Sequence, residues 1–266
     1  MRCDLSNLES INSIDFSGID AVVHCAGVVD EDFRDDASIA FNRATVGMEA
    51  FLFGARASGI RRFAYISSAH VYGRLEGKID ENAAPNPLSN YAIAHFATEQ
   101  LIRRVTCPDF RAVSFRPCAV FGIPNDLAAF RRWTLIPFDF PKSAAIQGRI
   151  VLKSFGDQFR NFVGTADIAQ CVSNWLRDAD SPDYCIANPI GKENMSVWQF
   201  AQLCADIAEH VTGRPVSLAR IEGASAGPRL EYETVYSEYR CGQDLRETIT
   251  ALTEMLWKQK DQLQGP

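Results

Sequence analysis

Short apolar runs alternate with helix-like patterns along most of this 266-residue chain. The run Ala21-Val22-Val23 has no polar residue between its members, as in a strand that is covered on both faces. Strands that are separated by helices usually join one parallel sheet, because the chain must cross over between them. The alternation therefore predicts an α/β fold built on a parallel sheet.

The pattern also predicts where the elements lie. We expect strands over residues 20–26, 62–67, 111–116 and 150–155. We expect helices over residues 38–58, 89–105, 165–176, 196–210 and 244–260, with Ser89 and Ser196 as N-caps. Residues 124–149 hold several prolines and predict a loop-rich region, and residues 220–243 show no clear pattern.

Composition excludes several classes of protein. The hydrophobic content of 47% is enough to fill a large core, and the net charge of −6 argues against general nucleic-acid binding. The eight cysteines form neither a Cys-x-x-Cys pair nor a zinc-spaced cluster, so we expect free thiols in a reducing compartment and no metal.

The chain shows no signal-peptide pattern and no apolar run near the ~20 residues of a membrane span. We therefore expect a cytoplasmic protein without membrane contact.

Two polar segments follow the expected strand at 62–67. The first is Ser67-Ser68-Ala69-His70-Val71-Tyr72-Gly73, and the second is Tyr91-Ala92-Ile93-Ala94-His95. Open α/β sheets bind ligands at the carboxyl ends of their strands. Tyr91 and His95 are one helical turn apart, and a cation there would favour the tyrosinate and lower its pKa. The segments predict an acid–base site, although ordinary polar residues on a helix surface remain the alternative.

Together, the two segments resemble the extended short-chain dehydrogenase/reductase family, also called NAD-dependent epimerase/dehydratases. That family carries Ser or Thr and then Tyr-x-x-x-Lys one helix later. The resemblance implies that Tyr91 exchanges a proton with the substrate, that Ser68 hydrogen-bonds the same oxygen, and that His95 takes the place of the Lys. That Lys binds the nicotinamide ribose and tunes the Tyr.

Further matches extend the resemblance over most of the chain. Asp4-Leu5, Val23-His24-Cys25-Ala26-Gly27 and Arg116-Pro117-Cys118 are similar to family segments that line the cofactor. The resemblance implies NAD or NADP contacts at Asp4, Leu5, Ala26, Gly27, Tyr91, His95, Pro117 and Cys118. Gly156-Asp157-Gln158-Phe159-Arg160 is similar to a segment whose Arg binds the diphosphate of a nucleotide sugar, which makes Arg160, with Ser68, a candidate substrate-binding residue.

The chain departs from the family pattern in several places. His95 stands where the family has Lys, Ala119 stands where many nucleotide-sugar enzymes have Asn, and Asn161 replaces an Asp. An unperturbed His, with a pKa of about 6.5, is mostly neutral at pH 7. The family's N-terminal Gly-x-x-Gly-x-x-Gly segment, whose backbone approaches the pyrophosphate, has no counterpart in this sequence.

This difference leads to an expectation about the sheet. We expect a Rossmann-like sheet that is incomplete at its N-terminal side, with the strand at 20–26 as a hydrophobic edge. Two explanations stay open: a truncated product or start site, or an edge covered by a partner.

The resemblance also implies a division of labour within the chain. We expect an NAD(P)-binding Rossmann-like domain over 1–123 plus 163–187, and a smaller substrate-binding lobe over 124–162 plus 188–266. The implied function is epimerase or dehydratase chemistry on a sugar, a nucleotide sugar or a small alcohol or carbonyl compound. The alternative is a catalytically inactive family member that acts as a binding or regulatory protein. A homodimer through helices near 42–57 and 90–105 is implied by the family as well.

Overall fold

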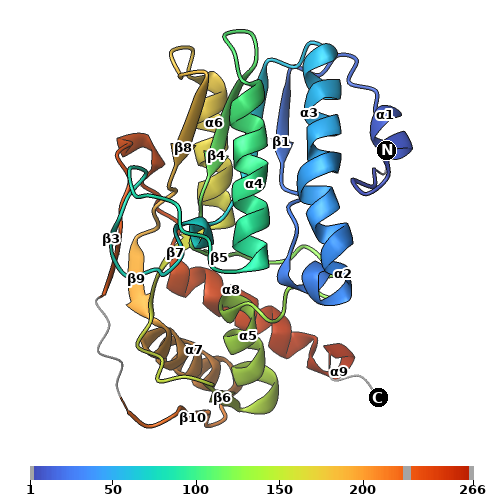
Figure 1. The fold of residues 1–266 in the computed structure, drawn as a ribbon. Coiled ribbons are helices and arrows are strands. Elements are labelled where there is room, and N and C mark those ends of the chain that lie inside the picture. The colour runs from blue at the N-terminus through green and yellow to red at the C-terminus, as the bar shows by residue number, and fades with distance from the viewer. Residues whose placement is uncertain (1–2, 224–228, 264–266) are drawn as a thin grey trace.

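The structure is a computed structural model that describes residues 3–223 and 229–263. A four-stranded parallel sheet forms the upper part of the molecule in Figure 1. Its strands follow the order β1-β2-β4-β8, and each neighbouring pair is parallel. Their bounds are β1 (Ala21–His24), β2 (Arg62–Ile66), β4 (Arg111–Phe115) and β8 (Tyr184–Ala187). The predicted α/β fold with a Rossmann-type parallel sheet is confirmed.

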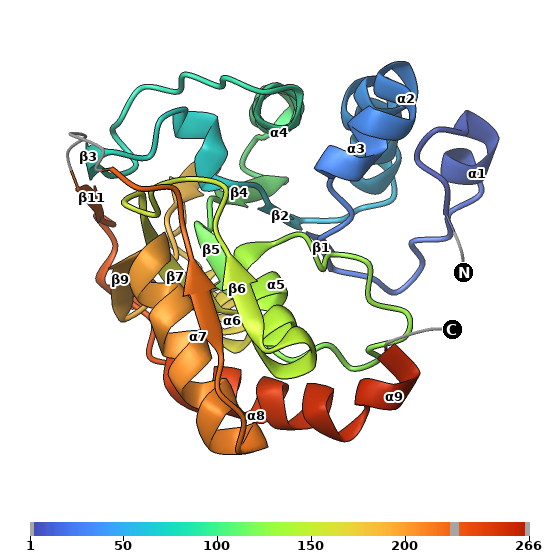
Figure 2. The same ribbon diagram turned by 90° about the horizontal axis from the view of Figure 1, so that it is seen from below.

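Helices cover both faces of this sheet (Figures 1 and 2). One face is covered by α3 (Met48–Ala57) and α4 (Asn90–Val105), and the other by α6 (Thr165–Arg177). The pleat explains the sorting: Phe63 and Tyr65 of β2 pack towards α3 and α4, whereas Ala64 between them packs towards α6. The short helix α1 (Leu8–Asn12) packs against α3.

The lower part of the molecule has its own core. Three helices, α5 (Ile136–Lys142), α7 (Val197–Thr212) and α8 (Leu245–Lys258), pack around the small sheet β5-β7-β9. The rings of Phe162 and Phe200 stack there at 4.5 Å between centroids. The remaining elements are β3 (Gly77–Ile79) with β11 (Leu230–Tyr232), β5 (Ala119–Phe121), β6 (Arg149–Val151) with β10 (Ser217–Ala219), β7 (Phe159–Gly164), β9 (Glu193–Ser196) and α9 (Lys260–Leu263).

Several predicted helix starts are confirmed by their caps. The Ser89 hydroxyl accepts a hydrogen bond from the Ala92 amide at 3.2 Å, and the Ser196 hydroxyl accepts one from the Gln199 amide at 3.1 Å. These caps satisfy amides that have no partner within the helix. Strands and helices that were predicted around 62–67, 89–105, 111–116 and 165–176 agree with the structure within about two residues.

Three predictions were wrong in detail. The strand expected over residues 150–155 is β6, which ends at Val151. The helix expected at 38 begins eight residues earlier, as α2 (Asp30–Asn42), and continues through a π-helical turn (Arg43–Gly47) into α3. The Asp32 carboxylate accepts a hydrogen bond from the Val29 amide at 2.8 Å and caps this early start, which a polar stretch without apolar spacing does not reveal.

The loop-rich region at 124–149 also contains the helix α5 and a further π-helical turn (Ser143–Gln147). Pro137 lies in the first turn of α5, where a missing amide proton is tolerated. The weakly patterned region at 220–243 contains β11, and its residues 224–228 lie outside the described part of the chain.

Among the described strands, β1 lies at the edge of the sheet, as predicted, but its faces are less covered than its apolar run predicts. β1 pairs only with β2 among the described residues, and Val23 is 44% exposed. A strand at the edge of a sheet can be covered on fewer sides than a central strand. The unbroken apolar run of β1 therefore did not mean that both of its faces are covered.

Other expectations concern the molecule as a whole. No helix within the described ranges is long and apolar enough to cross a membrane. Within the same residues no group of three or more His, Cys, Asp or Glu side chains is arranged to hold a metal ion. The division into 1–123 plus 163–187 and 124–162 plus 188–266 stays a prediction.

Candidate active site

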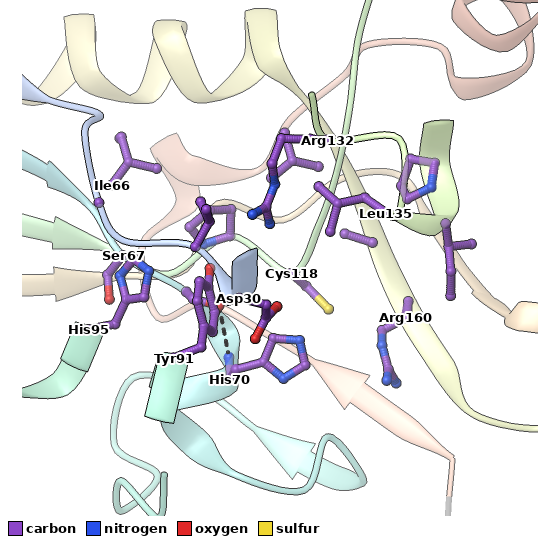
Figure 3. Close-up of a pocket in the computed structure, with 18 of the residues that line it drawn as sticks. Asp30, Ile66, Ser67, His70, Tyr91, His95, Cys118, Arg132, Leu135 and Arg160 are labelled. Atoms are coloured by element: carbon purple, nitrogen blue, oxygen red, sulfur yellow. Dashed lines mark hydrogen bonds between the residues drawn. The ribbon is translucent and has the colours of Figure 1, made fainter. Parts of the chain in front are cut away.

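A cavity of about 380 Å³ lies at the carboxyl ends of β2 and β4, where the sheet meets the lower part of the molecule (Figure 3). Its walls come from six segments of the chain. Among the lining residues are Gly27, Asp30, Ser68, His70, Tyr91, His95, Pro117, Cys118, Arg132 and Arg160. The structure therefore brings together seven of the predicted site residues: Gly27, Ser68, Tyr91, His95, Pro117, Cys118 and Arg160.

Tyr91 enters the cavity from the first turn of α4, which Ser89 caps. Burial raises the pKa of the Tyr91 hydroxyl, while interaction with the Ser68 hydroxyl and the charge of Arg132 act in the opposite direction. The carboxylate of Asp30 adds to the rise. Tyr91 is therefore protonated at neutral pH.

The two neighbouring serines have different partners. The Ser67 hydroxyl donates a hydrogen bond of 2.5 Å to the buried Glu99 carboxylate. The Ser68 hydroxyl accepts a hydrogen bond from the His70 amide at 3.2 Å and faces Tyr91 in the cavity. Ser68 is therefore the serine that is placed to touch a ligand beside Tyr91.

His95 is neutral at pH 7, as its ordinary pKa indicates, and its surroundings make it harder still to protonate. Its Nδ1 is hydrogen-bonded to the Tyr65 hydroxyl at 2.6 Å, and its ring packs edge-on to that of Tyr91 at 4.4 Å between centroids. Burial lowers the pKa of His95 to about 4, so the imidazole is neutral at pH 7. A charged partner for Tyr91 is thus missing from position 95.

The wall beside His95 is narrow. His95 Nε2 is buried and has no hydrogen-bond partner in residues 3–223 and 229–263. A Cβ atom on Gly27 would lie 2.9 Å from His95 Cε1, so only glycine leaves room for the ring at this wall. The His95 ring therefore borders the cavity beside the Gly27 backbone.

Arg160 lies across the cavity from His95 (Figure 3). Its guanidinium donates a hydrogen bond of 2.7 Å to the carbonyl of Phe159, and no carboxylate forms an ion pair with it in the described part of the chain. Cys118, also in the wall, is half-buried, and desolvation raises the pKa of its thiol, so it is a neutral thiol at pH 7. Arg160 therefore leaves an unneutralised positive charge in the cavity.

The remaining predicted cofactor residues line a second hollow. Asp4, Leu5 and Ala26 border a space of about 570 Å³ together with Arg43. The Asp4 carboxylate is exposed and accepts hydrogen bonds from the amide and hydroxyl of Ser6, at 2.9 and 2.7 Å. Ala26 and Gly27 are consecutive in the chain, so the two hollows lie on either side of one short segment.

A buried ion pair holds the framework of the site. Arg116 and Glu99 are both fully buried and form a two-point contact, with distances of 3.0 Å (Nε to Oε1) and 2.6 Å (Nη2 to Oε2). The pair joins the end of β4 to α4, and Glu99 also binds Ser67 after β2. This network therefore fixes the three elements that carry Pro117, Tyr91 and Ser68.

Three cavity residues were missed at the level of the sequence. Asp30 and Arg132 lie in stretches without helical or strand periodicity, and His70 was noted only as part of a motif. Burial lowers the pKa of His70, with further contributions from Arg160 and, in the opposite direction, Asp30. No spacing rule connects residues 30, 70 and 132, because only the folded chain brings them together.

Comparison with known proteins agrees with this geometry. Residues 1–187 match the model of the NAD dependent epimerase/dehydratase family. Among similar solved structures is RMD from Pseudomonas aeruginosa complexed with NADPH, with a TM-score of 0.78, 20% identity, and coverage of 97% of this chain and 88% of that chain.

Two epimerases are similar as well. UDP-glucose 4-epimerase from Thermotoga maritima, solved with UDP-glucose, has a TM-score of 0.75 at 18% identity, covering 96% of this chain and 83% of its own. ADP-L-glycero-D-manno-heptose-6-epimerase from Helicobacter pylori has a TM-score of 0.73 at 17% identity, covering 96% and 78%. At these identities the likeness concerns the fold.

Proposed function

The chain belongs to the NAD-dependent epimerase/dehydratase family, and from this membership we propose that it catalyses epimerase or dehydratase chemistry on a sugar, with nucleotide sugars as the first candidates. The observation that carries the proposal is the meeting of Ser68, Tyr91 and Arg160 in one cavity at the strand ends. Tyr91 moves a proton to or from a substrate oxygen, and Ser68 hydrogen-bonds the same oxygen.

The residues present fit the nicotinamide part of a dinucleotide. The His95 ring, the narrow wall at Gly27 and the backbone at Pro117–Cys118 would hold it in the main cavity. Asp4, Leu5 and Ala26 would hold the adenosine part in the second hollow. When bound, NAD or NADP supplies an acceptor and donor of hydride at the substrate carbon.

Substrate binding would depend on the charge opposite Tyr91. Arg160 has no acidic partner among the described residues, and a guanidinium binds phosphate oxygens in a two-point arrangement. Two of the similar structures were solved with UDP-glucose. These features support a substrate with a diphosphate or another anionic group.

The test begins with binding and then separates binding from chemistry. We expect calorimetric titration to detect NAD or NADP, and a panel of nucleoside-diphosphate sugars to contain a substrate whose conversion is followed by chromatography. Tyr91→Phe should lower kcat on the order of 100-fold or more while leaving dinucleotide affinity within about twofold, because it removes only the transferred proton.

Tyr236→Phe is the matched control, since Tyr236 packs against Tyr239 outside the cavity. It should leave kcat unchanged. Absence of dinucleotide binding by the wild-type protein would contradict the proposal and favour a binding or regulatory role.

A further inference from the structure

Tyr91 needs a positive charge that position 95 does not provide. A buried tyrosine holds its proton tightly, and a nearby cation makes the ionised form accessible. The His95 imidazole is neutral and committed to the Tyr65 hydroxyl. Another group must therefore stabilise the tyrosinate if Tyr91 also acts as a base.

We propose that Arg132, in the segment between β5 and α5, supplies the positive charge that stabilises the ionised form of Tyr91. This inference rests on the proposed function for the use of Tyr91 as an acid and base. Arg132 lines the same cavity, and its guanidinium points into it (Figure 3). Its side chain is 24% exposed, so solvent screens its charge only in part.

One ion pair holds Arg132 in place, and a second contact holds its partner Glu31. Arg132 Nη1 forms an ion pair of 2.6 Å with the Glu31 carboxylate, which also accepts a hydrogen bond of 2.9 Å from the Thr134 hydroxyl. Glu31 lies in the first turn of α2, next to Asp30. Glu31 is thus a positioning residue, which ties a segment without regular structure to the sheet side of the cavity.

The charges around Tyr91 favour Arg132 over other candidates. The charge of Arg132 lowers the pKa of Tyr91 and also that of His95, so its field reaches both residues. The Asp30 carboxylate has the opposite effect and raises the pKa of Tyr91. Arg160 acts on His70 and Cys118 instead.

The other groups that face Tyr91 are neutral at pH 7. Ser68 carries a hydroxyl, and burial keeps His70 and His95 unprotonated there. Within the described part of the chain, Arg132 and Asp30 are therefore the charges that act on the ionisation of Tyr91. Because Arg132 is the positive one, its removal should shift the Tyr91 titration to higher pH.

A spectroscopic titration tests this without substrate. Tyrosinate absorbance is recorded against pH for the wild type and for Tyr91→Phe, and the difference isolates Tyr91. The same difference is then taken in the Arg132→Gln, Arg132→Lys and Arg160→Gln backgrounds. We expect Arg132→Gln to move the titration to higher pH, Arg132→Lys to move it less, and Arg160→Gln to leave it in place.

Three results would overturn the assignment: no movement in Arg132→Gln, equal movement in Arg160→Gln, or equal movement in Arg132→Lys, where the charge is kept. The rate offers a second readout. The rise of kcat with pH should move in the same direction in Arg132→Gln, with a loss on the order of tenfold at pH 8 and KM changed less than kcat.

The two proposals can fail separately. A shifted titration in a protein that binds no dinucleotide and converts no sugar would leave the electrostatic role of Arg132 standing and remove the proposed function. Turnover together with an unmoved titration would do the reverse. Folding of each variant is checked by circular dichroism, and Arg132→Lys keeps the comparison valid if Arg132→Gln does not fold.

Discussion

The imidazoles of His24 and His95 lie in the interior beside Tyr65. His24 packs among aromatic rings, with centroids 5.6 Å from Tyr65, 5.8 Å from Phe51 and 6.1 Å from Phe63. Burial lowers the pKa of each histidine from 6.5 to about 4. Both rings are therefore neutral in the folded protein and protonated more readily in the unfolded chain.

This difference predicts a pH dependence of stability. Above pH 6.5 the neutral rings impose no penalty, and as the pH falls from 6.5 to 4 the unfolded chain takes up protons that the folded chain refuses. The free energy of unfolding should fall over this window by on the order of 1 kcal/mol per pH unit for each histidine.

His24→Phe tests this at one residue, because an aromatic ring is kept while the titration is removed. Urea unfolding at pH 5 and pH 8 should show a smaller difference between the two pH values in the variant than in the wild type. His210→Phe is a control for an exposed histidine on α7. An unchanged difference in His24→Phe would contradict the account.

At the scale of elements, close approach of backbones decides where the N-terminal segment lies. The carbonyl oxygen of Leu5 sits against the π-helical turn, and a Cβ atom on Gly47 would lie 1.9 Å from it. The backbone carbonyl of Leu5 cannot move aside as the end of a flexible side chain could. Gly47 therefore allows the segment around Asp4 and Leu5 to border the second hollow.

Gly47→Ala should displace this segment, lower the free energy of unfolding by about 1–3 kcal/mol and weaken dinucleotide binding. Gly54→Ala, in α3 of the same helical run, is the matched control, since its nearest neighbour is a Phe16 ring atom at 3.9 Å. That control should keep or raise stability, because alanine favours a helix interior. Equal affinity in both variants would argue against a cofactor contact at Asp4 and Leu5.

At the scale of the whole molecule, the cavity lies where the four-stranded sheet with its helices meets the lower part of the molecule, and segments of both parts form its walls. The ion pair between Glu31 and Arg132 spans this junction, and α8 packs under it with Leu252 and Leu256 fully buried. The junction thus depends on one polar bridge at the cavity and on apolar packing below it.

Glu31→Gln should loosen the bridge without unfolding the molecule, since a partly exposed ion pair contributes at most about 1 kcal/mol. We expect faster amide hydrogen exchange over residues 124–135 and a smaller effect elsewhere, measured by mass spectrometry. Glu49→Gln, which breaks an ion pair with Arg104 on the outer surface, should leave exchange in 124–135 unchanged. Uniform acceleration in Glu31→Gln would mean that the bridge stabilises the whole fold instead.

The sequence by itself determined the parallel α/β fold, the family and most helix starts, because these depend on local periodicity, capping residues such as Ser89 and Ser196, and motifs of fixed spacing. It also singled out Ser68, Tyr91 and Arg160, which the fold brings to one cavity. Their roles stay a prediction.

Tertiary structure decided the rest. Burial beside Tyr65 and Gly27 lowers the pKa of His95 to about 4, well below its ordinary value, and this burial is not a property of nearby sequence. The 44% exposure of Val23 likewise depends on which elements cover the edge strand. Arg132 and Asp30 are about one hundred residues apart and share no pattern. Electrostatic fields act through space, so the charges that set the ionisation of Tyr91 became visible only once the chain was folded.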